Sequence, residues 1–392
     1  MRTIGDDERR ARLGVRHLLA APGTSAEEAA DALVGLHSTD PSSVYLETLA
    51  RVSPFKSGDL EDALYERRSL VRMLGMRRTL FVVPRDFAAV MDEACAKALA
   101  AAEHRRLVRM LEEQEVVPAG RGARWVDRVA KKTLDALAAR GEATARQLTT
   151  DVPELANKLV FGEGRRWAGT MGVSTRILFL LATRGTIVRA RPLGSWTSGQ
   201  YRWARIDDWL GRPLGSPGHE EACAQVVRRY LRAFGPATMT DLRWWTGWTA
   251  KLSAASLAGA GAVEVPLAHG AGYLMPDDLD PVDPPDPWVA LLPSLDATVM
   301  GWKERDWYLG RHAEALFDRA GNAGPTVMVD GRVLGAWTQR PDGTIATELL
   351  EPVPARTRRR IDAESERLRD WLGDVRWTPR FRTPLESRLS SV

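Results

Sequence analysis

The sequence predicts a helix-rich α+β protein with three tandem winged-helix units followed by a C-terminal β-rich domain. Three observations support this fold class. A short stretch typical of a capped helix occurs three times, and each copy follows an amphipathic helix and precedes two strand-like runs. Beyond residue 276, a segment rich in Pro and Asp separates these repeats from further strand-like sequence.

In each repeat, Gly and a small residue or Thr precede a short helix-like run that contains an acidic or amide residue. The three stretches are "PGTSAEEAADAL" (22–33), "RGEATARQLTTDV" (140–152) and "FGPATMTDLRWWTG" (234–247). The helices expected before them lie at 7–20, 121–139 and 219–233, and the strand pairs expected after them lie within 70–83, 186–206 and 262–275. Helix, turn, helix and hairpin is the order of a winged helix, so we expect units at 1–116, 117–212 and 213–276.

The middle unit shows this pattern most clearly. Thr144 in this unit, and Thr238 in the third, stand after Gly where a hydroxyl can cap the second helix. A third helix is expected over 170–184, ended by Gly185, with the tip of the wing at "PLGSW" (192–196). In a winged helix, the third helix can enter a major groove while the wing contacts the backbone or the minor groove.

The C-terminal part of the chain differs in composition and in predicted secondary structure. The segment "PDDLDPVDPPDP" cannot form regular structure, and we assign 277–287 as a linker before a β-rich domain at 288–392. Within that domain, the Asp-Gly pairs at 330–331 and 342–343 predict tight hairpins. The other expected elements are a helix at 354–372 and a last strand at "VRWTPRF" (375–381).

Composition is typical of a soluble globular protein. The chain has 392 residues, of which 44% are apolar and 27% charged. The start, "MRTIGDDERR", does not resemble a signal peptide, and no stretch approaches the roughly 20 apolar residues of a membrane span. Cys95 and Cys223 are far apart and fit a reducing compartment. We expect a cytoplasmic, nucleoid-associated monomer without membrane contact.

Several kinds of chemistry lack a motif in this sequence. The six histidines show no metal-ligand spacing, so we expect neither a metal nor a cofactor. No Walker loop and no Gly-x-Ser-x-Gly elbow is present. The stretch "GEGRRWAG" (162–169) lacks the spacing of a dinucleotide-binding loop and is discounted.

Charge is unevenly distributed. Residues 121–212 contain 17 Lys and Arg against 8 Asp and Glu, whereas residues 213–300 contain 5 against 10. A basic segment in a near-neutral chain fits either a surface that faces a polyanion or an ordinary solvated face. Several of the 14 Trp residues neighbour cations, which suits stacking on nucleic-acid bases as well as core packing.

The stretch "GLHSTDPSSVYL" (35–46) lies where one helix is expected to end and another to begin. Asp40 before Pro41 is typical of a helix start, because a carboxylate can accept bonds from the free N–H groups of the first turn. His37, Ser38 and Thr39 follow an apolar helix face that ends at Leu36. They form either a connection between helices or part of a site.

Four segments together resemble the winged-helix DNA glycosylases of the azinomycin-resistance type, AlkZ-like and YcaQ-like. The segments are "LVGLHSTDPSSVYLETLARV" (33–52), "RMLGMRRTLFVVP" (72–84), "LLPSLDATVMGWKERDWYL" (291–309) and "PTVMVDGRVLGAWTQRPDG" (325–343). The resemblance covers nearly the whole chain. It implies a C-shaped clamp of three winged-helix units and a β-rich domain around duplex DNA, and the excision of N7-alkylated purines, including bulky or crosslinked antibiotic adducts.

The resemblance also implies the catalytic residues. The family's Gln-x-Gln or Gln-x-Asp pair falls on His37 and Thr39 of this chain. An N7-alkylguanine is a cation that leaves as a neutral base, so the enzyme has to stabilise the sugar cation and hold a water in line. A neutral imidazole can do this and accept the proton of the water. Asp40 either adds negative charge near the sugar or only caps the helix. The nearest lysine is Lys56, which favours direct hydrolysis over a Schiff base.

DNA contacts are expected from basic and aromatic residues. The candidates are Arg77 and Arg78 before the run "TLFVV", then Trp196, Arg202 and Trp203 on the second wing, and Lys303 and Arg305 in "GWKERDW". The alternative function is a non-catalytic winged-helix DNA-binding or regulatory protein. Regulators normally carry one such unit per protomer and dimerise on palindromes, which differs from three non-identical units in one chain.

Overall fold

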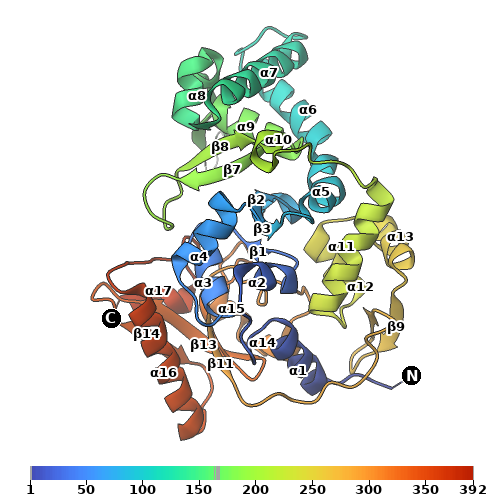
Figure 1. The fold of residues 1–392 in the computed structure, drawn as a ribbon, viewed down its shortest axis with the longest axis vertical. Coiled ribbons are helices and arrows are strands. Elements are labelled where there is room, and N and C mark those ends of the chain that lie inside the picture. Colours follow the sequence, from blue (N-terminus) through green and yellow to red (C-terminus); the bar gives the residue numbers. More distant parts are fainter. Residues whose placement is uncertain (1, 163, 165–167, 392) are drawn as a thin grey trace. The chain divides into compact units, whose positions relative to one another are not determined.

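The computed structural model describes residues 2–162, 164 and 168–391, and helices and strands alternate along them (Figure 1). The chain divides into two compact units. The first contains residues 2–70, 81–84 and 223–391, and the second contains Val71–Leu80 and Arg85–Ala222. Each unit therefore combines segments that are distant in the sequence, and the boundaries expected for individual winged-helix units stay predictions.

The first unit begins with α1 (Asp6–Arg16) and α2 (Ala26–Ala32). Helix α1 is shorter than the expected 7–20, since Leu18 has a φ of 56°, which a helix cannot contain. Ser25 caps α2 by accepting the N–H of Glu28. The following elements of this unit are β1 (Leu36–His37), α3 (Ser43–Leu49), α4 (Ser57–Glu61), the π-helical turn η1 (Asp62–Glu66) and most of β3 (Leu80–Pro84).

The third repeat forms the order of elements that the sequence predicts. Its helices are α11 (His219–Phe234), α12 (Met239–Thr246) and α13 (Ala250–Ala260), followed by the antiparallel strands β9 (Val263–Pro266) and β10 (Ala271–Leu274). The hydroxyl of Thr238 caps α12 by accepting the N–H of Asp241, and Gly247 ends this helix in the left-handed conformation. The expected helix at 219–233 and the cap at Thr238 are confirmed.

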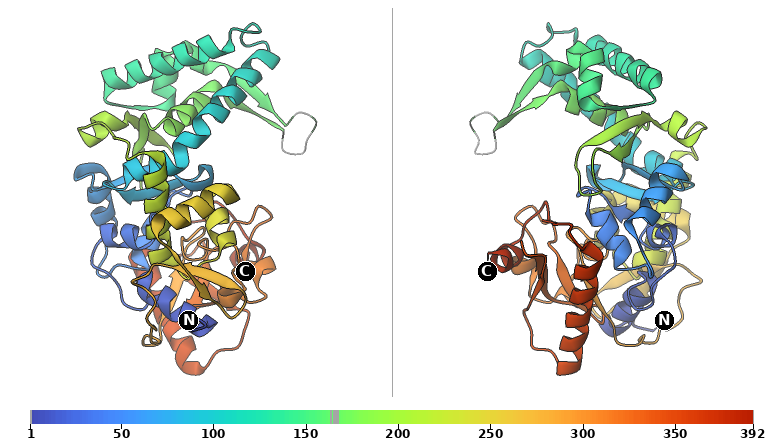
Figure 2. Two further views of the ribbon diagram at one scale, coloured as in Figure 1. Left: turned by 90° about the vertical axis from the view of Figure 1, so that its right-hand side faces the viewer. Right: turned by 60° about the vertical axis from the view of Figure 1, so that its left-hand side comes forward.

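A four-stranded antiparallel sheet, in the order β11-β12-β13-β14, forms the C-terminal part of the first unit. Its strands are β11 (Val289–Leu292), β12 (Thr326–Val329), β13 (Arg332–Gln339) and β14 (Ile345–Leu349), and the short helices α14 (Asp306–Leu309) and α15 (Ala313–Leu316) lie between β11 and β12 in the sequence. Asp330 and Gly331 both have positive φ in the turn between β12 and β13, as a primed hairpin turn requires. The long helix α16 (Ala355–Leu372) packs against β11 and β14 (Figure 2).

One expected strand of this region is wrong. Residues 375–381 form no strand, and a helix that the sequence did not indicate, α17 (Pro384–Ser390), follows them. Two backbone N–H groups of the segment bind side chains instead of a neighbouring strand: Trp377 donates to the Gln339 amide oxygen at 2.7 Å, and Arg380 donates to the Asp40 carboxylate at 3.1 Å. The segment 276–287 contains no helix or strand, as predicted.

The second unit contains the middle repeat. Its elements are β2 (Leu70–Leu74, all but its first residue), the turn η2 (Met76–Arg78), α5 (Ala88–Met91), the π-helical turn η3 (Asp92–Ala96), α6 (Lys97–Glu113), α7 (Gly122–Arg140), β4 (Glu142–Thr144), α8 (Ala145–Asp151), the turn η4 (Pro153–Ala156), β5 (Lys158–Phe161), β6 (Gly169–Gly172), α9 (Val173–Thr183), β7 (Ile187–Pro192), β8 (Tyr201–Arg205) and α10 (Ile206–Leu210). Apolar residues of α6, α7, α8 and α9 share one buried core.

The local signals of this repeat are largely confirmed. Thr144 caps α8 and forms a capping box with Gln147. The tip at 192–196 begins at Pro192, the last residue of β7, and leads toward β8, and both strands join β4 in a sheet of order β4-β8-β7. The third helix begins later than expected, because residues 170–172 pair with β5 in the antiparallel strand β6. Part of "GEGRRWAG" (162–169) lies outside the described residues.

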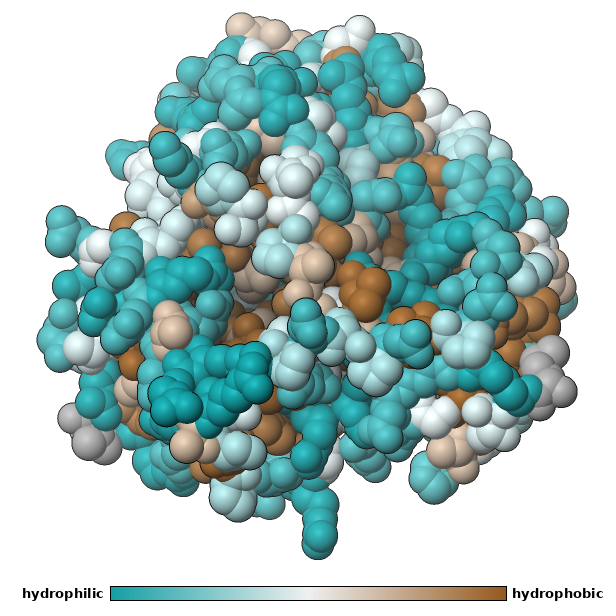
Figure 3. Space-filling model, turned by 60° about the horizontal axis from the view of Figure 1, so that its bottom comes forward, coloured by the Kyte–Doolittle hydropathy of each residue, from teal (hydrophilic) through white to brown (hydrophobic). Residues whose placement is uncertain are grey.

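The surface shows little exposed apolar material. The face drawn in Figure 3 is mostly hydrophilic, with hydrophobic residues in small groups. Among the described residues, the exposed large hydrophobic side chains are Val15 and Val160. The helices within the described part of the chain include none that is long and apolar enough to cross a bilayer.

Candidate active site

The candidate motif lies on a short strand, which corrects the expectation that it ends a helix. Leu36 and His37 form β1, which pairs antiparallel with β3, so that His37 lies opposite Phe81. Gly35 before them has a φ of 142°, and a Cβ atom there would lie 2.9 Å from Val83 Cγ1. Val34 has a φ of 61°, which is rare for a β-branched residue. The strained approach turns the chain from α2 directly onto the edge of β3.

The His37 side chain is nearly buried. Only 4% of the residue is exposed, and its ring meets the Phe81 ring edge-on, with centroids 5.1 Å apart. Ser38 is buried and Thr39 is half-buried, so Thr39 offers the larger accessible surface of the candidate pair. His37 is the last residue of β1 and Thr39 lies in the bend two residues beyond it, while the packing on Phe81 holds the His37 ring.

Asp40 is held in a turn rather than at a helix terminus. One carboxylate oxygen accepts the N–H of Ser42 at 3.1 Å and its hydroxyl at 2.6 Å, and the other accepts the backbone N–H of Arg380. Helix α3 begins at Ser43. The prediction that Pro41 is the first residue of this helix is therefore wrong. Because Asp40 is buried and both its oxygens bind neighbouring groups, its geometry fits a structural role in the loop.

The C-terminal segment 375–382 adds a second bond to this loop. The indole N–H of Trp377 donates to the Ser42 hydroxyl at 2.6 Å, and the Arg380 guanidinium lies 3.4 Å from the carbonyl oxygen of Thr39. The side chains of Asp40 and Ser42 thus connect the candidate motif to a segment more than 330 residues further along the chain. The loop and the C-terminal domain form one packed structure.

Glu47 on α3 holds the backbone of the motif from the other side. One carboxylate oxygen accepts the N–H of His37 at 2.9 Å, and the other accepts the N–H of Ala297 at 2.8 Å. The carboxylate is fully buried. Burial and the nearby Asp296 raise the pKa of Glu47 well above its usual range, although Arg51 and the two N–H groups oppose this shift. Sequence analysis did not identify Glu47, since a charged residue in "YLETLARV" looks like part of an exposed helix face.

A buried ion pair lies next to Glu47. The Arg51 guanidinium binds both oxygens of the Asp296 carboxylate, at 2.7 and 2.9 Å, and both residues are fully buried. Arg51 also donates to the hydroxyl of Thr298, which contacts the Nδ1 atom of His17 at 2.8 Å. Burial and the charge of Arg51 lower the pKa of His17 well below its usual range, so this imidazole is neutral.

Because His17 is neutral, only one of its ring nitrogens carries a hydrogen. The Nε2 atom of His17 lies 3.1 Å from the carbonyl oxygen of Ala233, an acceptor only, so Nε2 carries the hydrogen and Nδ1 accepts from Thr298. Buried ion pairs contribute little net stability, but removal of one partner costs about 3–5 kcal/mol. The network therefore specifies how the segment 294–298 packs against α3, directly behind the motif.

The candidate DNA contacts occupy several environments in the second unit. Arg77 and Arg78 have positive φ in η2, and Arg78 pairs with Glu103 at 2.6 Å. Trp196 is 8% exposed, which leaves it little surface for stacking. Arg202 and Trp203 are half-buried on β8.

The two candidates of the first unit lie in the loop after Trp302. Lys303 is exposed, and its backbone N–H donates to Asp241 at 2.8 Å. The Arg305 guanidinium lies 5.0 Å from the ring centroid of Trp244 and 4.6 Å from that of Phe317. Arg305 is therefore held by two aromatic rings. In the described ranges, no group of three His, Cys, Asp or Glu side chains could hold a metal ion.

Comparisons with known proteins show the family of this chain and the similarity of its fold. Residues 30–371 match the family described as DNA glycosylase AlkZ-like. The fold is similar to that of Streptomyces sahachiroi DNA glycosylase AlkZ, with a TM-score of 0.73 and 20% sequence identity over 97% of this chain and 100% of that chain. None of the curated proteins matches the chain. The class of protein defined here is thus a DNA glycosylase, an enzyme of DNA repair. The chain belongs to the AlkZ-like DNA glycosylase family.

Proposed function

We propose that this chain is a monofunctional glycosylase that hydrolyses the N-glycosidic bond of N7-alkylated purines in duplex DNA. The observation that carries the proposal is the double anchoring of the motif: Glu47 binds the backbone of His37, and Asp40 binds that of Arg380. By the sequence resemblance, the anchored pair corresponds to the catalytic positions of the family. The two chains of contacts orient His37 and Thr39 before any substrate binds, which is what positioning a water requires.

The reaction needs little acid catalysis from the protein. A purine alkylated at N7 carries a positive charge and departs as a neutral base, which leaves the cationic character on the sugar. The imidazole of His37 orients the attacking water and accepts its proton, and the Thr39 hydroxyl contacts the water or a sugar oxygen. Because His37 is nearly buried, little bulk solvent reaches its imidazole.

The proposal includes the DNA substrate, the location of the protein and its DNA contacts. The three blocks of helices and hairpin act as winged-helix units on duplex DNA, and the adducts are bulky or crosslinked ones of the kind made by antibiotics, in a role of self-resistance. The enzyme is a cytoplasmic, nucleoid-associated monomer. Phosphate contacts come from Arg77, Arg78, Arg202, Lys303 and Arg305, with Trp203 as an aromatic contact.

The test is single-turnover excision from a duplex that carries one N7-alkylguanine, with a small and a bulky alkyl group. His37→Ala should lower the rate by about 10²–10⁴-fold, nearer the low end because the leaving group is already activated. His37→Gln, which restores the family's residue, should keep substantial activity. His312→Ala is the matched control, since His312 pairs with Glu351 outside the motif. Equal rates for all four proteins would exclude a catalytic role of His37.

One observation also supports a second function, the binding of damaged DNA without catalysis. The low exposure of His37 also fits a protein that binds damaged DNA without excising the base. Wild-type protein that binds both adducts but excises neither would favour this binding-only function.

A further inference from the structure

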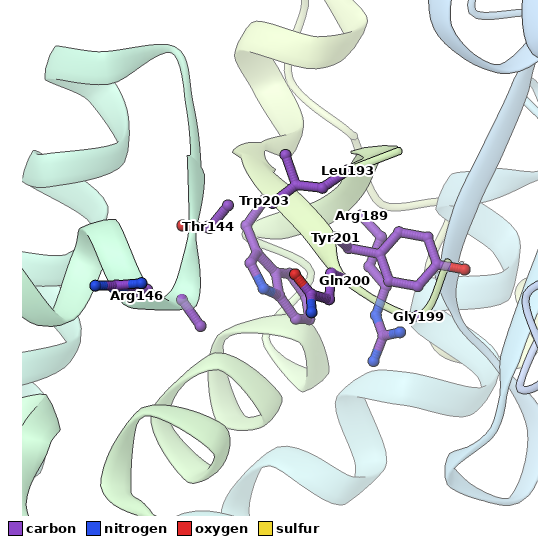
Figure 4. Close-up of a pocket in the computed structure, with 9 residues that line it drawn as sticks. Thr144, Arg146, Arg189, Leu193, Gly199, Gln200, Tyr201 and Trp203 are labelled. Atoms are coloured by element: carbon purple, nitrogen blue, oxygen red, sulfur yellow. The ribbon is translucent and has the colours of Figure 1, made fainter. Parts of the chain in front are cut away.

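The second unit contains a pocket that takes no part in the proposed reaction, although Trp203 in its wall is one of the proposed DNA contacts. It has a volume of about 380 Å³ and opens between the start of α8 and the hairpin of β7 and β8 (Figure 4). Its walls include Arg146 from α8, Arg189 from β7, and Gln200, Tyr201 and Trp203 from the β8 side. Every lining residue belongs to this one unit, and the volume lies within the range of small-molecule sites.

The wall on the hairpin side is a stack of alternating aromatic and cationic planes. The Arg189 guanidinium lies 5.1 Å from the ring centroid of Trp203 and 4.9 Å from that of Tyr201, and the Arg72 guanidinium lies 5.0 Å from the Tyr201 ring. The sheet produces this order, since Tyr201 and Trp203 are two residues apart on β8 and Arg189 is the cross-strand partner of Trp203. The planes are ordered before a ligand arrives, which lowers the entropic cost of binding.

The rest of the lining combines polar and cationic groups with the apolar Ala145 and Leu193. The lining residues include no carboxylate within the described part of the chain. Arg146 and Gln200 are exposed, and Figure 4 shows Trp203 between Arg146 on one side and Tyr201 with Arg189 on the other. An aromatic face beside arginines and a carboxamide suits a planar, hydrogen-bonding ring that carries a negative charge. A nucleotide has all of these features.

We propose that this pocket binds one unstacked nucleotide of DNA, with the base against Trp203 and the phosphate at Arg146. A base inside a duplex has both faces covered by its neighbours, so only an extrahelical or single-stranded nucleotide can use the indole in this way. Damaged or mispaired positions lose less energy on unstacking, which makes such a nucleotide available near a lesion. The inference rests on the proposed function, in which the protein binds DNA, and adds that the protein recognises a locally unpaired nucleotide.

The test compares two duplexes by equilibrium binding. One carries a single bulged 2-aminopurine nucleotide, and the other has the same sequence fully paired. Wild-type protein should bind the bulged duplex about tenfold more tightly, within the range expected for stacking of one base, and should quench the 2-aminopurine fluorescence. Trp203→Leu and Arg146→Ala should each reduce this preference to about threefold or less, while Trp203→Phe should retain an intermediate value.

The controls separate stacking from other effects. Arg205→Ala removes a partly exposed arginine of the same strand, outside the pocket, and should leave the ratio of affinities unchanged. Arg146 is exposed, so Arg146→Ala tests the pocket even if Trp203→Leu unfolds the protein. An unchanged preference for the bulged duplex in folded Trp203→Leu or Arg146→Ala would overturn the proposal. Free dAMP that displaces the bulged duplex at an equal concentration would also overturn it, because the pocket would then bind a free nucleotide and not DNA. The bulged duplex carries no alkylated base, so its binding does not depend on excision. A protein that keeps the preference for the bulge but does not excise N7-alkylguanine would refute only the proposed reaction.

Discussion

The backbone N–H of Arg380 donates to the carboxylate of Asp40 at 3.1 Å, across 340 residues of sequence. This bond connects the loop of the candidate motif to the C-terminal segment that precedes α17. Together with the bond from Trp377 to Ser42, it explains why the loop of the candidate motif near the N-terminus and a distant C-terminal segment occur in one compact unit.

The first prediction concerns Asp40. Asp40→Asn should destabilise the protein by about 1–3 kcal/mol, because an amide cannot accept all the bonds that the carboxylate accepts. Trp377→Phe removes one further bond to the same loop and should lower the free energy of unfolding by about 1 kcal/mol. Denaturant unfolding measures both changes. The two variants should reduce excision to a similar extent if Asp40 only positions the motif, whereas a far larger loss in Asp40→Asn would indicate that its charge acts on the sugar.

The second prediction concerns Glu47. Glu47→Gln keeps the shape of the side chain but can accept only one of the two N–H groups well, so the backbone of His37 or Ala297 loses its partner. Single-turnover excision should fall by about 10-fold, with unchanged affinity for the alkylated duplex. Glu61→Gln, at a half-buried position of α4 outside the motif, provides the control. A normal rate in folded Glu47→Gln would show that the motif does not depend on this anchor.

The third prediction concerns the buried Asp92 of η3. The residue is 1% exposed, and burial raises its pKa to about 6, with Lys97 at 3.8 Å opposing the shift. Since its pKa is higher in the folded than in the unfolded chain, Asp92 favours the folded state below about pH 4. That contribution is lost as the pH rises through 6.

Asp92→Asn removes this ionisation. The variant should therefore be more stable than wild type at pH 7.5, by about 1–3 kcal/mol, and about equal to it at pH 4. Thermal unfolding at the two pH values measures the difference. Asp135→Asn, in an exposed pair with Lys131, should change stability little at either pH. Destabilisation of Asp92→Asn at pH 7.5 would contradict the prediction.

The fourth prediction concerns electrostatic binding to DNA. Affinity for duplex DNA should fall steeply with salt, with a log–log slope of roughly −0.9 per phosphate contact. Arg77→Ala and Arg78→Ala should each weaken binding to all sequences alike and flatten the slope by about one contact, less for Arg78 because it already pairs with Glu103. Arg140→Ala, which removes an arginine paired with Asp151, is the control. If the slopes of both variants equal that of wild type, the two residues do not contact phosphates.

Much of the fold could be predicted from local signals. The amphipathic periods of α7, α11 and α16, the capping hydroxyls of Thr144 and Thr238, and the Asp-Gly turns depend on residues within one or two turns of chain. These interactions form wherever the segment lies in the molecule, so the sequence alone can determine them. The C-shaped clamp and the bounds of single units are long-range properties and stay predictions.

The sequence also indicated the candidate motif, although not its structure. Residues 33–52 resemble the family closely enough to mark His37 and Thr39, but the expected helix end is a strand whose residues pair with partners 44 and 46 positions away. That pairing depends on Gly35 and on the position of β3, neither of which is a periodic signal. A two-residue strand is set by its partner, since it has no cooperative stability of its own.

By itself, therefore, the sequence determined the local elements, their caps and the family. Only the tertiary structure decided that 375–381 binds Asp40 instead of forming a strand, that Glu47, Arg51 and Asp296 are buried behind the motif, and that Trp203, Arg189 and Tyr201 stack. Each of these outcomes depends on which distant groups share a desolvated space. A charge or an indole has the same local signature on a surface as in a core, and burial, which the fold alone sets, determines what it does.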